Sequence, residues 1–176
     1  MPFTPFHLGP GLFAAALLFA LADLPTFLLA SVILDIEPGS VRIFRLLNLT
    51  PPYAYHGFLH TFVGATFAAL ALARFLNWLA AKYRNSRIFG YAWKPTKNAV
   101  FLASFIGIYL HVFADSFVNV DMRPFWPYPE NPLLGLVPPL AIYLACFLLF
   151  VAGALLYYAR LIRASGSPFL KPAVPK

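Results

Sequence analysis

Charged residues are scarce in this chain, and acidic residues are the scarcest of them. Of 176 residues, 11% are charged and only six are aspartate or glutamate, whereas 61% are hydrophobic. A soluble domain has about a quarter of its residues charged, so the composition excludes an ordinary soluble protein. The single cysteine, Cys146, excludes an intramolecular disulfide. No nucleic-acid-binding motif is present, and the absence of a Gly-x-Ser-x-Gly elbow disfavours a serine hydrolase.

Long hydrophobic stretches are abundant. A helix needs about 20 apolar residues to cross the hydrocarbon core, and four stretches approach or exceed that length: 11–34, 57–80, 98–118 and 133–158. We therefore predict an all-α integral membrane protein with three to five membrane-embedded helices and the lipid bilayer as its surroundings. Residues 1–165 are expected to form one domain, followed by a disordered, proline-rich tail at 166–176.

The first hydrophobic stretch is interrupted near its middle by Asp23 and Pro25. A carboxylate is costly inside a membrane, and proline removes a hydrogen bond from a helix. Three interpretations are open: one kinked span, two short helices that enter and leave on the same side, or a signal peptide cleaved before Asp23. The segment before this stretch lacks the basic residues that a signal peptide needs.

The basic residues are distributed unevenly along the chain. Ten of the thirteen lie in or near the 81–97 loop or after the last hydrophobic stretch, and only Arg42, Arg45 and Arg123 lie elsewhere. The positive-inside rule therefore predicts an inner- or plasma-membrane protein whose 81–97 loop and C-terminus are cytoplasmic. Anionic lipid headgroups account for the basic surface without any nucleic-acid partner.

The few histidines lie at the ends of hydrophobic stretches, and most are paired with another potential metal ligand. His56 and His60 are four residues apart at the start of the second stretch, and His111 and Asp115 are four apart near the end of the third. Residues at this spacing share one face of a helix. Imidazole and carboxylate groups are ligands for zinc and similar metals, so each pair is a candidate half of a metal site.

Topology predicts that these pairs meet. If the 81–97 loop is cytoplasmic, both pairs lie toward the outer face, and the first stretch delivers Asp35 and Glu37 to the same side. His7 joins them only if the first stretch folds back as a hairpin. Chance would scatter such residues over both faces, so we expect one shared metal site near the outer surface.

Five short motifs occur in an order that resembles a known family: FHLGPG, LDIEP, HGFLHT, HVFAD and RPFWP. Over roughly residues 1–130 the chain resembles the membrane-bound, metal-dependent hydrolases of the LexA-binding inner-membrane hydrolase superfamily. The resemblance implies a helical membrane protein with a metal centre held by His7, Asp35, His56, His60, His111 and Asp115. Many members carry a second aspartate and a histidine where this chain has Glu37 and Pro38, and an arginine where it has Gly57.

The implied reaction is hydrolysis at one or two divalent ions, with zinc as the expected metal. A metal ion lowers the pKa of bound water to near neutrality, and whichever of Glu37 and Asp35 is not a ligand would be the general base. A paired-metal site suits an ester or phosphoester, such as a phospholipid headgroup linkage. Arg123, in the loop beyond Asp115, is the candidate group for binding an anionic substrate oxygen.

Two other classes of protein remain open. A divalent-metal transporter would also use paired histidine and aspartate residues, but such sites usually lie near the midplane of the membrane. A haem-binding helical bundle would use histidines on facing helices, yet it has no role for the accompanying carboxylates. Metal binding or transport without hydrolysis is the main alternative function.

Overall fold

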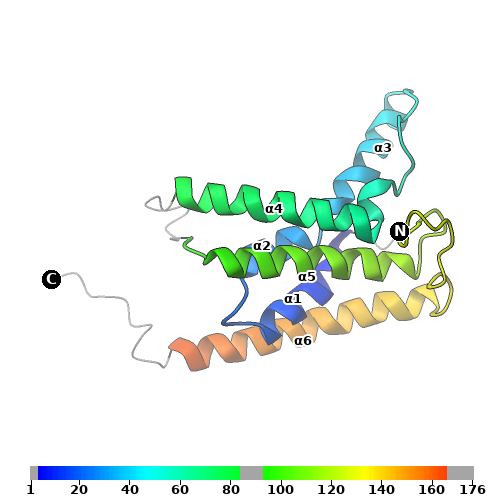
Figure 1. Cartoon of the computed structure of the whole chain (residues 1–176). Helices are drawn as coiled ribbons and strands as arrows, with labels where there is room; N and C mark the ends of the chain where they lie inside the picture. The colour runs from blue at the N-terminus through cyan, green and yellow to red at the C-terminus, as the bar shows by residue number, and fades with distance from the viewer. Residues whose placement is uncertain (1–3, 84–92, 166–176) are drawn as a thin grey trace.

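The computed structural model describes residues 4–83 and 93–165, and all regular elements within these ranges are helical (Figure 1). The elements, in chain order, are η1 (Thr4–His7), α1 (Leu8–Leu17), α2 (Leu24–Ala30), η2 (Ile33–Asp35), α3 (Ile36–Leu46), η3 (Phe58–His60), α4 (Phe62–Lys82), α5 (Lys97–Ser116) and α6 (Pro139–Ser165). The predicted all-α fold is confirmed. The tail predicted at 166–176, and the middle of the basic loop at 84–92, lie outside the described residues.

Three helices, α4, α5 and α6, are long and apolar enough to cross a membrane. At 1.5 Å per residue, a helix of 20 residues is about 30 Å long, which matches the hydrocarbon thickness. The start of α4 is set by Thr61 and that of α5 by Thr96, whose hydroxyl groups accept hydrogen bonds from the amides of Gly64 and Ala99. The protein is therefore a multi-pass membrane protein.

The first hydrophobic stretch forms a helical hairpin, α1 and α2, that enters and leaves at the same end of the bundle (Figure 1). With ten residues, α1 is about 15 Å long, half of what a span needs. Asp23 is the N-cap of α2: its carboxylate accepts hydrogen bonds from Thr26 N at 3.0 Å and from Trp93 Nε1 at 3.1 Å. The costly mid-stretch carboxylate is thus satisfied in the turn, and the hairpin alternative is confirmed.

The hairpin is held tightly against the last span. A Cβ atom added at Gly9 would lie 1.9 Å from the carbonyl oxygen of Cys146, and one at Gly153 would lie 2.7 Å from the amide nitrogen of Phe13. Only residues without a side chain allow α1 and α6 to approach this closely. At the other end of α1, Arg160 Nη1 donates to the Leu17 carbonyl at 2.9 Å and satisfies one of the free carbonyls of the helix terminus.

The helix α3 runs through a residue pair that would suit a turn. The Pro38-Gly39 pair is typical of a turn, but α3 continues through it from Ile36 to Leu46. Proline fits within the first turn of a helix because the amides there have no intrahelical partner. Figure 1 shows α3 pointing away from the bundle, across the direction of the three long helices.

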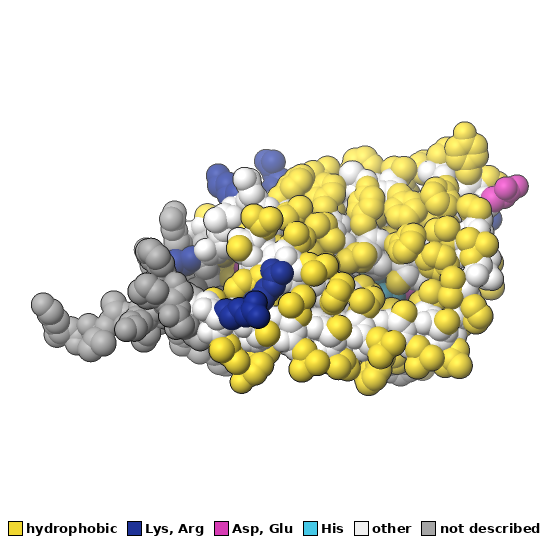
Figure 2. Space-filling view, turned by 90° about the horizontal axis from the view of Figure 1, so that it is seen from below, with side chains coloured by type: hydrophobic (Ala, Val, Ile, Leu, Met, Phe, Trp, Pro, Cys, Tyr) yellow, Lys and Arg dark blue, Asp and Glu magenta, His cyan; other side chains and the backbone are white. Residues whose placement is uncertain are grey.

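The two ends of the bundle differ in chemistry. Apolar side chains cover most of the face shown in Figure 2, and most of the basic side chains in view gather toward one end. That end contains the end of α4, the start of α5 and the end of α6, where Lys82, Lys97 and Arg163 lie. His56 and His60, just before α4, and His111, near the end of α5, lie at the opposite end.

Candidate metal centre

The helix α5 provides the base of the site. His111 and Asp115 lie on one face of its last two turns, as the sequence spacing predicted, and each is 1% exposed. His111 Nε2 lies 3.5 Å from Asp115 Oδ2. A buried carboxylate is strongly destabilising unless it has charged or hydrogen-bonding partners, so the surroundings of Asp115 decide what this site can hold.

His56 and His60 reach the same centre from the segment before α4. Their spacing predicts that they lie one above the other on a helix face, and this local prediction is wrong. His60 ends the short helix η3, His56 precedes it, and α4 begins only at Phe62 because Thr61 is its cap. Even so, both rings converge: His56 Nε2 and His60 Nε2 each lie 3.9 Å from Asp115 Oδ2.

The hairpin brings the N-terminal segment into the site. His7 Nε2 lies 3.2 Å from Asp115 Oδ1, and the His7 ring stacks on the His111 ring with centroids 4.0 Å apart. Asp35, where α2 leads into α3, approaches from the other side, with Oδ1 4.0 Å from His111 Nε2. We expected His7 to join the other residues only if the first hydrophobic stretch folds back as a hairpin. Helices α1 and α2 do fold back in this way, and His7 lies beside Asp115.

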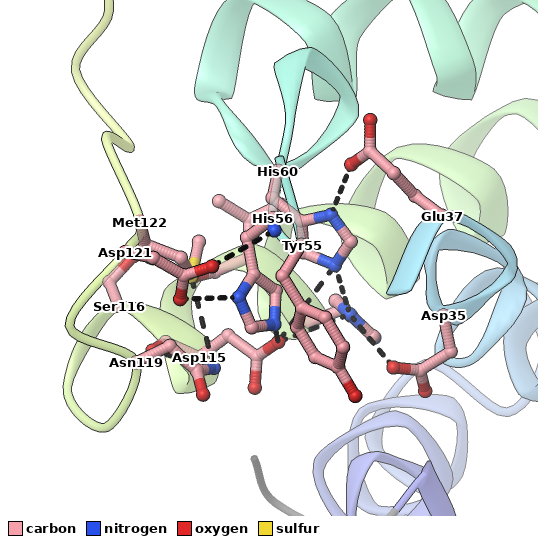
Figure 3. A network of polar contacts seen from close by, with 12 residues as sticks. Asp35, Glu37, Tyr55, His56, His60, Asp115, Ser116, Asn119, Asp121 and Met122 are labelled. Carbon is pink, nitrogen blue, oxygen red and sulfur yellow. Dashed lines mark hydrogen bonds and ion pairs between the residues drawn. The ribbon is translucent and has the colours of Figure 1, made fainter. Parts of the chain in front are cut away.

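Three of the four histidines bind an acceptor on the side of the ring away from the centre; Figure 3 shows this for His56 and His60. His56 Nδ1 lies 2.7 Å from Asp121 Oδ1, and His60 Nδ1 lies 2.7 Å from Glu37 Oε2. His111 Nδ1 lies 2.8 Å from the Ser31 carbonyl oxygen. A carbonyl or a carboxylate only accepts hydrogen bonds, so each Nδ1 is the donor. In the neutral ring, Nε2 then has no proton and directs its lone pair into the centre.

These lone pairs face one another. His60 Nε2 and His111 Nε2 are 3.3 Å apart, and both face the carboxylate of Asp115. Two acceptors at this distance, beside a negative charge in a buried site, repel each other. The arrangement becomes favourable only when a proton or a cation lies between them. Protonating several adjacent buried imidazoles is itself costly, so a cation fits better.

His56 can be considered separately because it lies outside the three spans. Burial lowers the pKa of His56 below its usual value, and the neighbouring His60 lowers it further, although Asp121 opposes the shift. His56 is therefore neutral at pH 7, and its Nε2 lone pair is available for binding.

The donor set fits a divalent metal ion. Within the described ranges, His7 Nδ1, His56 Nε2 and both oxygens of Asp115 are buried without a hydrogen-bond partner. Ligands about 2.1 Å from a tetrahedral ion lie about 3.4 Å apart, close to the 3.3 Å between His60 Nε2 and His111 Nε2. Three overlapping groups could hold an ion, namely His7-His111-Asp115, Asp35-His60-His111 and His56-His60-Asp115.

Two predicted catalytic or substrate residues lie outside this centre. Glu37 is on the far side of His60, where it also accepts a hydrogen bond from Gly57 N at 3.0 Å. Arg123 lines a cavity of about 670 Å³ that also contains His56 and Asp121. Glu37 therefore contacts a histidine rather than the centre itself, and Arg123 lies in a cavity that borders the centre at His56.

Asp121 is a site residue that the sequence patterns did not predict. Its carboxylate accepts from both Nδ1 and the backbone amide of His56, at 2.7 and 3.1 Å. Asp121 lies in a loop 65 residues away in the sequence, so no local spacing connects it with His56. The only signal was scarcity, because the chain has just six carboxylates and Asp121 follows closely after the His111-Asp115 pair.

The fold and the site together define a helical, multi-pass membrane protein with a buried histidine and aspartate centre that could hold a metal ion. Residues 1–170 match the family described as YdjM inner membrane protein, and the chain belongs to that family. The family identifies the membrane as the inner membrane. No curated protein and no solved structure matches the chain significantly.

Proposed function

We propose that this protein is a metal-dependent hydrolase of the inner membrane that cleaves an ester or phosphoester near the membrane surface. The observation that supports the proposal most is the set of three Nε2 lone pairs that converge with the Asp115 carboxylate in a buried centre. Such an arrangement is unfavourable without a cation. The resemblance to membrane-bound hydrolases agrees with it.

The proposed ligands are the residues that face the centre: His7, Asp35, His56, His60, His111 and Asp115. Nitrogen ligands with one or two carboxylates favour zinc among the common divalent ions. The overlap of the three possible groups at Asp115, His60 and His111 leaves room for one or two ions. When bound, the ion would supply a water molecule of lowered pKa and would polarise the substrate.

The surrounding carboxylates have different roles in this proposal. Glu37 holds the Nδ1 proton of His60 and so orients the His60 ring, as carboxylates behind metal-bound histidines commonly do. We therefore assign Glu37 a positioning role in place of the general-base role considered from the sequence. Asp121 does the same for His56. Asp35, at the edge of the centre, is the carboxylate placed to accept a proton when it is not a ligand.

The cavity beside His56 is the proposed substrate site. It is lined by polar and apolar groups, including Arg123, Trp126 and Asn131. A guanidinium group binds carboxylate or phosphate oxygens through two parallel hydrogen bonds, so Arg123 would orient an anionic substrate. A lipid-derived ester suits a cavity that has both an arginine and an indole ring at its wall.

The charge distribution supports an orientation. The basic ends of α4, α5 and α6 lie opposite the histidines, and the positive-inside rule assigns basic ends to the cytoplasm. We accordingly propose that the metal centre faces the outer side of the inner membrane.

Metal analysis followed by an activity screen tests the proposed function. Protein purified without added metal or chelator is expected to contain at least one equivalent of zinc, manganese or iron and to hydrolyse generic phosphodiester or ester substrates. Less than one equivalent would remove the basis of the proposal. Full metal content with flux into liposomes, but no turnover, would instead assign the protein to divalent-metal binding or transport.

Glu37→Gln tests the positioning role. Glutamine keeps the shape of Glu37 but removes the charge that holds the Nδ1 proton of His60. Loss of such a partner weakens metal binding by about 10–100-fold, measured by competition with a chelating indicator. Glu130→Gln is the matched control, because Glu130 lies exposed in the loop after Arg123, and it should leave the affinity unchanged. Equal affinities in the two variants would contradict the assignment.

A further inference from the structure

The helix α3 has little of its surface covered by the rest of the described protein. Its buried residues, Pro38 and Val41, lie in its first half. The second half extends away from the bundle, across the direction of the long helices (Figure 1). Spanning helices lie within about 20° of the membrane normal on average, so a helix that crosses their direction is expected to lie along the membrane surface, here at the end of the bundle where the candidate metal centre is.

One face of α3 and of the turn after it is apolar and uncovered. Ile36 is 65% exposed, Ile43 59%, Leu46 81% and Leu47 64%. Spacings of three, four and seven residues place these side chains on a single side of a helix. A face of this kind at the level of the membrane surface is typical of a helix that lies within the interface, with its apolar side in the acyl-chain boundary.

The other side of α3 carries two arginines. The guanidinium carbons of Arg42 and Arg45 each lie 5.7 Å from the centre of the Tyr55 ring, and Arg42 Nε donates to the Tyr55 hydroxyl. Both side chains are exposed. Ten of the thirteen basic residues lie in or near the 81–97 loop or after the last hydrophobic stretch of the sequence, and two of the remaining three are on this one helix. Arginine binds phosphate oxygens with a planar pair of donors.

We propose that α3 is an interfacial helix. Its apolar face lies in the acyl-chain boundary, and Arg42 and Arg45 bind the phosphate groups of anionic lipids. Tyr55, held between the arginines, lies next to His56 with ring centroids 5.3 Å apart. The helix therefore places His56 and the cavity that it lines at the level of the lipid headgroups. This role goes beyond the proposed function, because it needs neither a bound metal nor hydrolysis.

Spin labels at single cysteines test the position of the helix. In full-length protein carrying Cys146→Ala, reconstituted in lipid nanodiscs, labels are placed at Ile43, at Phe67 on the lipid-facing side of α4, and at Glu130 in the exposed loop. Collisions with oxygen report lipid, and collisions with a water-soluble nickel chelate report water. The ratio of the oxygen collision rate to the nickel-chelate collision rate at Ile43 is expected to be close to the ratio at Phe67 and several-fold above the ratio at Glu130.

Two outcomes would overturn the placement. A ratio at Ile43 equal to that at Glu130 would put α3 in water. Exclusion of both reagents, together with spin–spin broadening, would show that a second copy of the chain covers the apolar face. Metal content measured on the same samples separates this result from the proposed function, because a failed placement with full metal content leaves the metal centre intact.

Anionic-lipid preference tests the arginines. A fluorophore at Leu49→Cys is quenched by brominated phosphatidylglycerol or by brominated phosphatidylcholine, and the ratio gives the local preference. Each arginine near an anionic surface contributes about fivefold to that preference, so Arg42→Gln with Arg45→Gln should nearly abolish it. Lys94→Gln with Lys97→Gln, at the other end of the bundle, should leave it unchanged. An unchanged preference in the arginine variant would show that α3 binds no phosphate.

Discussion

Asp115→Asn is expected to abolish metal binding while leaving the fold intact. The carboxylate oxygens of Asp115 lie 3.2–3.9 Å from the Nε2 atoms of all four histidines, so Asp115 is the one group that every histidine of the centre approaches. Asparagine has the same shape but no charge, and it presents amide protons to the centre. Because removing a mere orienting partner weakens binding by about 10–100-fold, loss of this ligand should exceed about 100-fold. Metal content by elemental analysis measures it.

In the metal-free protein, by contrast, Asp115→Asn should not lower the thermal stability. Without metal, the wild-type Asp115 carboxylate is buried, and although His7 Nε2 lies 3.2 Å away, no hydrogen bond to it forms among the described residues, so the cost of burying this charge is only partly offset. The side-chain amide introduced by Asp115→Asn removes that charge and can donate to a histidine lone pair. The metal-free variant is therefore expected to be at least as stable as metal-free wild type in thermal unfolding.

Asp23→Asn is the matched control. Asp23 is the N-cap of α2 at the opposite end of the bundle and accepts hydrogen bonds from Thr26 N and Trp93 Nε1. Asparagine caps a helix about as well as aspartate, but it has one acceptor oxygen in place of two, so the loss of a hydrogen bond from Thr26 or Trp93 should lower the free energy of unfolding by about 1 kcal/mol without affecting metal content. If both aspartate variants keep their metal, the centre described around Asp115 is not the metal site.

Gly9→Ala is expected to cause a large loss of stability for a single methyl addition. The new Cβ would lie 1.9 Å from the carbonyl oxygen of Cys146. This neighbour is backbone, which cannot rotate away, so α1 must move away from α6. Overpacking a tight contact costs about 1–3 kcal/mol and occasionally more, and we expect about 3 kcal/mol or more here. His7, two residues earlier, would leave Asp115, so metal affinity should fall as well.

Gly39→Ala is the control for this effect. Gly39 is within α3, and a Cβ there would meet nothing within 4 Å, so alanine should be neutral or slightly stabilising in the helix. Unfolding in mixed micelles of increasing denaturing detergent compares the two variants directly. Wild-type stability and metal content in Gly9→Ala would mean that the hairpin does not pack against α6 as the structure has it.

The spans could be predicted from the sequence because the bilayer sets their length. The stretch 98–118 corresponds to α5 at Lys97–Ser116, but the stretch 57–80 corresponds to α4 only from Phe62. Hydrophobicity does not mark that boundary; the cap at Thr61 does. The helix α3 escaped prediction for a related reason, because Pro38 and Gly39 are typical of turns and are also tolerated near the start of a helix.

Most residues of the candidate centre could be proposed from the sequence, but the way in which they are brought together could not. His111 and Asp115 meet through helix periodicity, as expected. His56 and His60 meet through an irregular turn, which a four-residue spacing suggests only by coincidence. The position of Glu37 behind His60 could not be inferred, because ligand and orienting carboxylates have the same chemistry and differ only in which ring nitrogen they face.

The sequence by itself determined the class of protein, the hydrophobic stretches and the scarcity of ionisable groups, because burial in lipid restricts composition and length strongly. That three of the four stretches form span-length helices and the first forms a hairpin was decided by the structure. The tertiary structure decided the tautomers. The hydrogen-bond partners of His56 and His111 come from 65 and 80 residues away, and no local period encodes such distances. Only with Asp121, Glu37 and the Ser31 carbonyl in place do the Nε2 lone pairs turn inward. That arrangement makes a cluster of histidines into a candidate metal centre.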